Sequence, residues 1–201
     1  MSDKHAYILG ITGGIGAGKS VASYLLRERG IPVYDTDTEA KRLMEESPEI
    51  RDSLIKMLGT QVYGVNGNLN RRLLANWMFK SASHLEKIND LVHPVVKRDF
   101  MSWCDGQDLP LVGVESAILY ESGFDEMANG VLLVSASEQV RMQRVMQRDG
   151  VTIDQVRARM AAQMSDEERK RRATYVLNNE GTLLEMERKI DIIINHILHN
   201  T

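Results

Sequence analysis

Short apolar runs alternate along the chain with longer segments in which apolar residues recur at helical spacing. Five short runs, rich in Val, Ile, Leu or Tyr, predict strands at residues 7–12, 31–35, 111–116, 131–135 and 174–178. The last helical segment carries one apolar stripe, which we interpret as core packing and which consists of Leu183, Met186, Ile190, Ile193, Ile194 and Ile197. This alternation indicates an α/β fold of three layers, with helices on both faces of a parallel five-stranded sheet.

Capping signals mark several helix starts. The pattern S/T-x-x-E/Q, in which a hydroxyl and an acid or amide cap a helix reciprocally, begins at Thr36, Ser83, Thr152, Ser165 and Thr182. Ser47 before Pro48 is typical of an N-cap followed by the first helical residue. We expect a turn at Asn66–Gly67, and we expect the His93–Pro94 step to start or kink a helix.

The composition is that of an ordinary globular protein, with 201 residues, 43% hydrophobic, 26% charged and a net charge of -3. This balance gives no electrostatic reason to expect a nucleic acid or a membrane as partner, and no feature indicates an obligate protein partner. The single cysteine, Cys104, excludes an intrachain disulfide framework. Because the N-terminus lacks the apolar stretch of a signal peptide and no run is long enough for a membrane span, we expect a cytoplasmic protein.

The most specific motif is a glycine-rich loop between the first apolar run and the first helical segment. It reads Gly13, Gly14, Ile15, Gly16, Ala17, Gly18, Lys19 and Ser20, which fits GxxxxGK[ST]. Such a loop aims backbone N–H groups and a helix dipole at one point, so it predicts a phosphate site. We expect Lys19 to neutralise the β- and γ-phosphates of ATP and the Ser20 hydroxyl to hold Mg²⁺. A dinucleotide motif is excluded because Lys19 stands where its third glycine would be.

Carboxylates follow two of the predicted strands. Asp35 and Asp37 end the second and Glu115 ends the third, and ligands of open α/β sheets bind outside these carboxyl ends. Asp37 also falls at a helix start, where the dipole favours an ionised carboxylate that can accept the proton of a substrate hydroxyl. For Asp35, helix capping and function are equally favoured. Glu115 either helps to hold Mg²⁺ or its water, or bonds a nearby backbone N–H.

Basic residues are concentrated between the fourth and fifth predicted strands. Arg141, Arg144 and Arg148 share one helix face, and Arg157, Arg159 and residues 169–172 follow. For most of them we expect a solvated helix with local ion pairs. Some of the first stripe should contact phosphate, because guanidinium groups match the charge of a phosphoryl group in transfer. We therefore expect a helical lid at 141–173, whose closure would exclude water.

Several motifs together resemble the dephospho-coenzyme A kinases. They occur in the order typical of that family, cover nearly the whole chain and lie at residues 11–20, 33–37, 67–72, 91–94, 144–149 and 175–179. The resemblance implies transfer of a phosphoryl group from ATP to the ribose 3′-hydroxyl of dephospho-coenzyme A, which gives coenzyme A and ADP in the last step of coenzyme A synthesis. It also implies one P-loop kinase domain over residues 1–201, with a core at 1–37, 108–140 and 174–201 and a helical acceptor-binding insert at 38–107.

The same resemblance implies roles for individual residues. Asp37 matches the proposed catalytic carboxylate, Lys19 the P-loop lysine and Arg144 a lid arginine near the phosphates. We expect the acceptor near Thr12, Asp37, Arg71, His93 and Glu121, and ATP near the phosphate loop, Val21, Arg148 and Asn179.

Three positions depart from the family pattern. Val21 replaces a threonine, Ala117 a proline and Ala75 an arginine, so one basic contact to the acceptor's phosphates is missing or supplied elsewhere. Two alternatives remain open: a nucleoside or nucleoside monophosphate kinase of the same architecture, and a P-loop regulatory switch. A GTP switch would need an NKxD motif, which the chain lacks.

Overall fold

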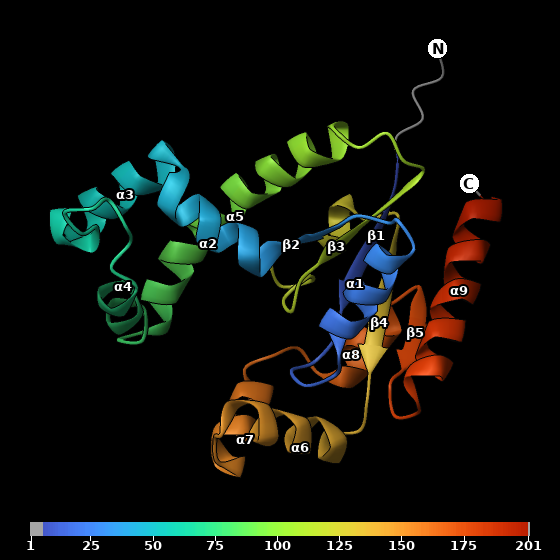
Figure 1. Ribbon diagram of the computed structural model, residues 1–201. Helices are drawn as coiled ribbons and strands as arrows, with labels where there is room; N and C mark the ends of the chain where they lie inside the picture. The colour runs from blue at the N-terminus through green and yellow to red at the C-terminus, as the bar shows by residue number, and fades with distance from the viewer. Residues whose placement is uncertain (1–5, 201) are drawn as a thin grey trace. The chain divides into compact units, whose positions relative to one another are not determined.

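A computed structural model describes residues 6–200 of the protein (Figure 1). The N-terminal residues 1–5, on which part of the expected location rests, lie outside the described residues. Two compact units are present. The sheet unit comprises the chain up to Asp35 and from Gln107 onward, and the helical unit comprises Thr36–Gly106.

The sheet unit is built on a five-stranded sheet whose paired strands are all parallel, in the order β2-β3-β1-β4-β5. Its strands are β1 (Tyr7–Thr12), β2 (Val33–Asp35), β3 (Leu111–Glu115), β4 (Gly130–Ser135) and β5 (Tyr175–Asn178). All five coincide with the short apolar runs, which confirms the predicted α/β fold. Every residue of β3 is buried, as expected for a parallel strand covered on both faces.

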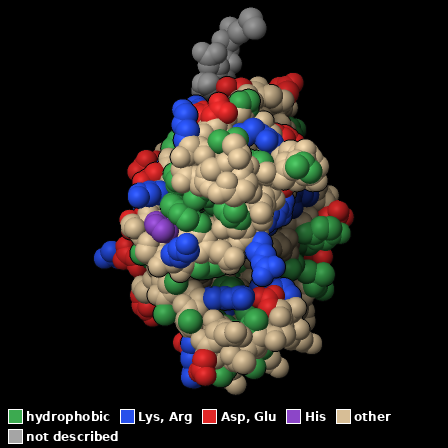
Figure 2. Space-filling view, turned by 90° about the vertical axis from the view of Figure 1, so that its left-hand side faces the viewer, with side chains coloured by type: hydrophobic (Ala, Val, Ile, Leu, Met, Phe, Trp, Pro, Cys, Tyr) green, Lys and Arg blue, Asp and Glu red, His purple; other side chains and the backbone are tan. Residues whose placement is uncertain are grey.

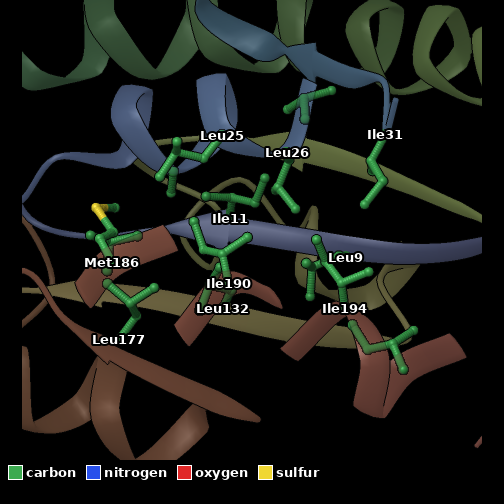
Figure 3. Close-up of a cluster of buried hydrophobic side chains, with 14 of the residues drawn as sticks. Leu9, Ile11, Leu25, Leu26, Ile31, Leu132, Leu177, Met186, Ile190 and Ile194 are labelled. Atoms are coloured by element: carbon green, nitrogen blue, oxygen red, sulfur yellow. The ribbon is translucent and has the colours of Figure 1, made fainter. Parts of the chain in front are cut away.

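Helices of the sheet unit follow the strands in sequence. They are α1 (Lys19–Glu28), the 3₁₀ turn η2 (Asp125–Met127), α6 (Glu138–Asp149), α7 (Ile153–Ala161), α8 (Asp166–Arg172) and α9 (Leu183–Asn200). Figure 3 shows Leu25 of α1 and Ile190 of α9 near Ile11 of β1, in one buried cluster, so α1 and α9 cover the same face of the sheet. On the other face, Leu119 lies against Gly10 of β1 and α8 lies against β4.

The helical unit, drawn from cyan to green in Figure 1, contains α2 (Thr36–Glu46), α3 (Pro48–Leu58), the 3₁₀ turn η1 (Thr60–Val62), α4 (Arg71–Met78) and α5 (Ala82–Asp105). Helix α2 packs against both α3 and α5. The guanidinium of Arg42 joins α2 to α5, because it bonds Asp99 of α5 at 2.8 Å while it also pairs with Glu39 and Glu46 of its own helix.

Most of the capping predictions are confirmed. Ser47 accepts the N–H of Ile50 ahead of Pro48, and Ser165 accepts the N–H of Glu168. Reciprocal capping bonds join Thr152 to Gln155 and Thr182 to Glu185. The turn at Asn66–Gly67 is also present, with Gly67 at φ 82°.

Three sequence expectations were wrong in detail. The N-cap of α5 is Ser81 rather than Ser83, because Ser81 has the extended backbone of a cap and its hydroxyl accepts the N–H of His84. Of the two alternatives at His93–Pro94, a helix start is wrong, since α5 runs through Pro94 with Val92, Val95 and Val96 buried around it. Leu183 is 55% exposed because it is the first residue of α9, one turn before Met186 reaches the core.

None of the helices in residues 6–200 combines the length and the apolar character that crossing a bilayer requires.

Two isoleucines of α9 offer a matched test of the core. Ile190 is 1% exposed and Ile192 is 67% exposed. We expect Ile190→Ala to lower the free energy of unfolding by about 2–5 kcal/mol, because it leaves a cavity against α1 and the sheet. Ile192→Ala should change it by less than about 0.5 kcal/mol. Urea unfolding followed by circular dichroism measures both, and equal midpoints for the two variants would contradict this packing.

Candidate active site

The phosphate loop connects the end of β1 to the start of α1. Gly16 and Gly18 adopt positive φ angles of 79° and 99°, and Gly18 is the N-cap of α1. The Nζ of Lys19 donates to the carbonyl of Gly13 at 3.0 Å, so the lysine folds back over its own loop. The loop therefore places its backbone amides and the positive end of the α1 dipole at the same edge of the sheet, which is an arrangement that binds anions.

Close packing explains why glycines are needed in this loop. A Cβ on Gly16 would lie 2.5 Å from the carbonyl oxygen of Arg141 and 2.9 Å from Val145, both in α6. A Cβ on Gly14 would collide with the guanidinium of Arg141, and one on Gly18 would collide with the amide of Asn179. The loop is thus enclosed by α6 and by the segment that follows β5.

Two carboxylates stand beside the loop at the same edge. In the register of the sheet, Asp35 of β2 lies opposite Glu115 of β3, and Glu115 lies opposite Ile11 of β1. Glu115 is 8% exposed. Burial raises the pKa of the Glu115 carboxyl, and Asp35 raises it further, whereas Lys19 lowers it.

The oxygen atoms of this site fit Mg²⁺ if the ion is shared with a bound nucleotide. The exposed hydroxyl of Ser20, at the start of α1, and the strand-end carboxylates are hard oxygen donors. Among the described residues, no group of three or more His, Cys, Asp or Glu could hold a metal ion by itself. A magnesium ion here would therefore need phosphate oxygens to complete its shell, as is usual for Mg²⁺ bound with a nucleotide.

The helices α6, α7 and α8 carry the arginines, and their exposure divides them into two groups. Arg148, Arg157, Arg159, Arg171 and Arg172 are exposed, and several pair with nearby acids, as expected. Figure 2 shows that many Lys, Arg, Asp and Glu side chains reach the surface on the face drawn.

The expectation of solvated side chains is wrong for Arg141 and Arg169, which are only 5% and 1% exposed. Both guanidinium groups pair with the carboxylate of Asp166, which compensates part of their charge and allows their burial. The Nε of Arg141 and the Nε and Nη2 of Arg169 have no hydrogen-bond partner among the described residues, and neither does Nη1 of Arg144.

Two hydrogen bonds reach the phosphate loop from Gln163 and Asn179, and two more hold the segments that carry these residues. The Ile15 N–H donates to Oε1 of Gln163 at 2.9 Å, and the N–H of the next residue, Met164, donates to Glu121 at 3.1 Å. The amide of Asn179 donates to the carbonyl of Ala17 at 2.8 Å, and Arg144 donates to the carbonyl of Asn179 at 2.9 Å. Sequence reasoning missed Gln163, because nothing marks a single glutamine between two helices as a partner of the loop.

Three other residues of the sheet unit that we expected near the substrates differ in their exposure and their partners. Thr12 ends β1, is 1% exposed and has a hydroxyl without a partner among the described residues. Val21 is 39% exposed on the first turn of α1. Arg148 pairs with Asp149 at the end of α6.

Three further expected residues lie on three helices of the helical unit. Asp37 is in the first turn of α2, Arg71 starts α4 and His93 lies inside α5. Arg71 pairs with Glu45 of α2 at 2.9 Å. Burial lowers the pKa of His93, and Lys97 lowers it further, so the neutral imidazole is favoured.

Comparison with known proteins identifies the family of this chain. A family model described as dephospho-CoA kinase matches residues 7–185. The chain belongs to the dephospho-CoA kinase family. A dephospho-CoA kinase of Bacteroides fragilis is 42% identical over 174 residues, which cover 86% of this chain and 84% of that protein.

Solved structures agree with this membership. The crystal structure of TT1252 from Thermus thermophilus superimposes with a TM-score of 0.82 at 39% identity, covering 96% of this chain and 98% of that one. A dephospho-CoA kinase from Campylobacter jejuni, at 18% identity, shares the fold with a TM-score of 0.72 over 96% of this chain and 98% of that one. The resemblance to the dephospho-CoA kinase family seen in the sequence is therefore confirmed.

Substitution of two glycines that both have positive φ distinguishes the effect of backbone strain from the effect of a steric clash with α6. Gly16 has no room for a Cβ, whereas Gly150, at φ 64°, has no atom within 4 Å of one. We expect Gly16→Ala to weaken ATP binding by at least about tenfold, because α6 must move away from the loop. Gly150→Ala should cost about 1–2 kcal/mol of stability through strain and leave ATP binding unchanged. Titration calorimetry with ATP measures both; similar losses of affinity would show that α6 does not constrain the loop.

Proposed function

We propose that this protein transfers the γ-phosphoryl group of ATP to the ribose 3′-hydroxyl of dephospho-coenzyme A, giving coenzyme A and ADP in the last step of coenzyme A synthesis. The observation that carries this proposal is the match to the dephospho-CoA kinase family over residues 7–185. The phosphate loop and the strand-end carboxylates supply the chemistry that such a transfer needs.

The phosphate loop and Lys19 would bind the β- and γ-phosphates. The 3′-oxygen would attack the γ-phosphorus while the bond from that phosphorus to the β–γ bridging oxygen breaks, and Asp37 would accept the hydroxyl proton. Asp37 suits this role by its place in the first turn of α2, two residues after the end of β2. Arg144 would stabilise the charge on the transferring group, and the unpaired N–H groups of Arg141 and Arg169 would meet phosphate oxygens.

Ser20 and, through a water, Glu115 would hold Mg²⁺. When bound, the ion would neutralise part of the negative charge of the nucleotide's phosphates. Val21, Arg148 and Asn179 would complete the ATP site. Thr12, Arg71, His93 and Glu121 would lie near the acceptor.

In this proposal the parts of the chain have separate tasks. The insert at 38–107 binds the acceptor, the segment 141–173 acts as a lid, and the remaining residues form the core of one kinase domain. Both substrates are small molecules, so the reaction requires no protein partner, nucleic acid or membrane, and we place it in the cytoplasm.

An ATP-dependent assay that compares dephospho-coenzyme A with AMP and adenosine tests the proposal directly. We expect efficient transfer to dephospho-coenzyme A, with the product identified by mass as coenzyme A. Transfer only to AMP or adenosine would instead support a nucleoside or nucleoside monophosphate kinase, and nucleotide binding without transfer to any of them would support a regulatory switch.

Replacement of the proposed base tests the mechanism. We expect Asp37→Asn to lower kcat by about 10²- to 10⁴-fold and to leave ATP affinity unchanged, because it removes the proton acceptor and not the phosphate site. Asp52→Asn, at an exposed acid of α3, is the matched control and should behave as the wild type. Full turnover by Asp37→Asn would remove this residue from the mechanism.

The phosphate loop is tested at its lysine. We expect Lys19→Ala to weaken ATP binding and to lower kcat, because the charge that neutralises the β- and γ-phosphates is lost in both the ground state and the transition state. Lys56→Ala, at an exposed lysine of α3, should change neither quantity. Steady-state kinetics with calorimetry of ATP binding distinguishes the two variants, and unchanged kinetics for Lys19→Ala would refute the assignment of the loop.

A further inference from the structure

A pocket of about 460 Å³ lies in the helical unit, between η1 and one face of α4. Leu58, at the end of α3, and Gln61 of η1 line one side, and residues of α4 and of the turn that follows it line the other. This volume is in the range of pockets that hold small organic ligands. None of the residues proposed to bind ATP, Mg²⁺ or the acceptor lines this pocket, so the proposed reaction gives it no role.

The face of α4 at this pocket carries two rows of side chains. Arg72, Asn76 and Lys80 follow one another at intervals of four residues, with Lys80 just after the end of the helix. Leu73 and Trp77 form the row beside them. One row is polar and positively charged and the other is apolar, so this face presents cations and an aromatic ring side by side.

The two cations of the pocket lack a counter-charge. Within residues 6–200, neither the guanidinium of Arg72 nor the ammonium of Lys80 forms an ion pair or a side-chain hydrogen bond, and the lining contains no carboxylate. By contrast, Arg71 on the same helix pairs with Glu45. The helical rise separates Arg72 from Lys80 by about 12 Å along the axis, a distance over which two long side chains reach the same oligophosphate chain.

Two contacts with His84 orient the indole of Trp77. The imidazole stacks on the indole, with ring centroids 3.9 Å apart and planes inclined by 2°. Nδ1 of His84 donates to the carbonyl of Trp77 at 2.9 Å, which holds the imidazole in place. Trp77 lines the pocket and His84 does not, so the part of the indole that His84 leaves uncovered faces the pocket. A ring held in this way loses little freedom when a flat ligand stacks on it.

We propose that this pocket is a nucleotide site separate from the phosphate loop, with the base on Trp77 and the phosphates on Arg72 and Lys80. A nucleotide joins a flat ring to an anionic chain, and the pocket offers an aromatic surface for the first and unpaired cations for the second. The carboxamide of Asn76, which has no partner within the described chain, supplies a donor and an acceptor for the edge of the base. This inference does not rest on the identity of the acceptor or on the role of Asp37.

A protein with a single tryptophan reports on this pocket. Trp77 and Trp103 are the two tryptophans of the chain, so Trp103→Phe leaves Trp77 as the one indole. Adding Lys19→Ala disables the phosphate loop. We expect ADP to change the fluorescence of Trp77 saturably, with the same midpoint in the Trp103→Phe protein and in the double variant. Loss of the response on addition of Lys19→Ala would show that the signal arises from the phosphate loop and would overturn the proposal.

Removal of each cation tests the contact to the phosphates. In the double variant, we expect Arg72→Gln and Lys80→Gln each to raise the ADP concentration at half-saturation by about tenfold or more. Lys56→Gln, which removes an exposed charge from α3, should leave it unchanged. Wild-type affinity in both the Arg72→Gln and Lys80→Gln proteins would exclude binding of phosphate by these residues.

Two partial ligands distinguish a nucleotide site from a simple anion site. Inorganic pyrophosphate lacks the base and adenosine lacks the phosphates, so each should displace ADP from the double variant only at concentrations at least about tenfold higher than ADP itself requires. Displacement by pyrophosphate as efficient as by ADP would reduce the pocket to a general anion site. Equal efficiency of adenosine would leave the cations without a role, and either result would overturn the proposal.

Discussion

The contact between α6 and the phosphate loop constrains the rest of the sheet unit. The carbonyl oxygen of Arg141 occupies the space that a side chain at Gly16 would need, so the loop can take its positive-φ conformation only where that position is glycine. Gln163 and Asn179 then bond the loop from two further segments. The loop is thus held by residues distant in sequence, and it does not depend on its own few residues for its shape.

Positive charge is concentrated at the same contact between α6 and the phosphate loop. Two buried guanidinium groups share the single carboxylate of Asp166, and three of their nitrogen atoms have no partner within the described residues. Burying uncompensated positive charge and unpaired donors is unfavourable, so the folded sheet unit retains a site of positive potential beside its phosphate loop. A phosphate chain would supply both the missing charge and the missing acceptors. The stability lost in forming this arrangement would thereby be recovered on binding a nucleotide.

The sequence predicted the elements whose signal is local. The apolar runs located the five strands of the described chain, and the glycine motif located the loop between β1 and α1, because each depends on residues adjacent in the chain. Predictions failed where distant contacts decide. Arg141 and Arg169 lie in basic segments that are solvated elsewhere, and only Asp166 and the packing of α6 and α8 on the sheet unit make them buried. Pro94 removes one hydrogen bond from α5, but buried valines on its neighbouring turns keep the helix continuous.

Helix α2 begins directly after β2, so the chain passes from the strand-end Asp35 to Asp37 in the first helical turn within two residues. In the proposed reaction, this short connection would hold the carboxylate that accepts the hydroxyl proton at a fixed distance from the end of the strand. Contacts to the remote parts of the acceptor would then be converted into correct orientation of its reacting hydroxyl at Asp37. A nucleoside that lacked those remote parts would lose this orientation, even if its hydroxyl could reach the same carboxylate.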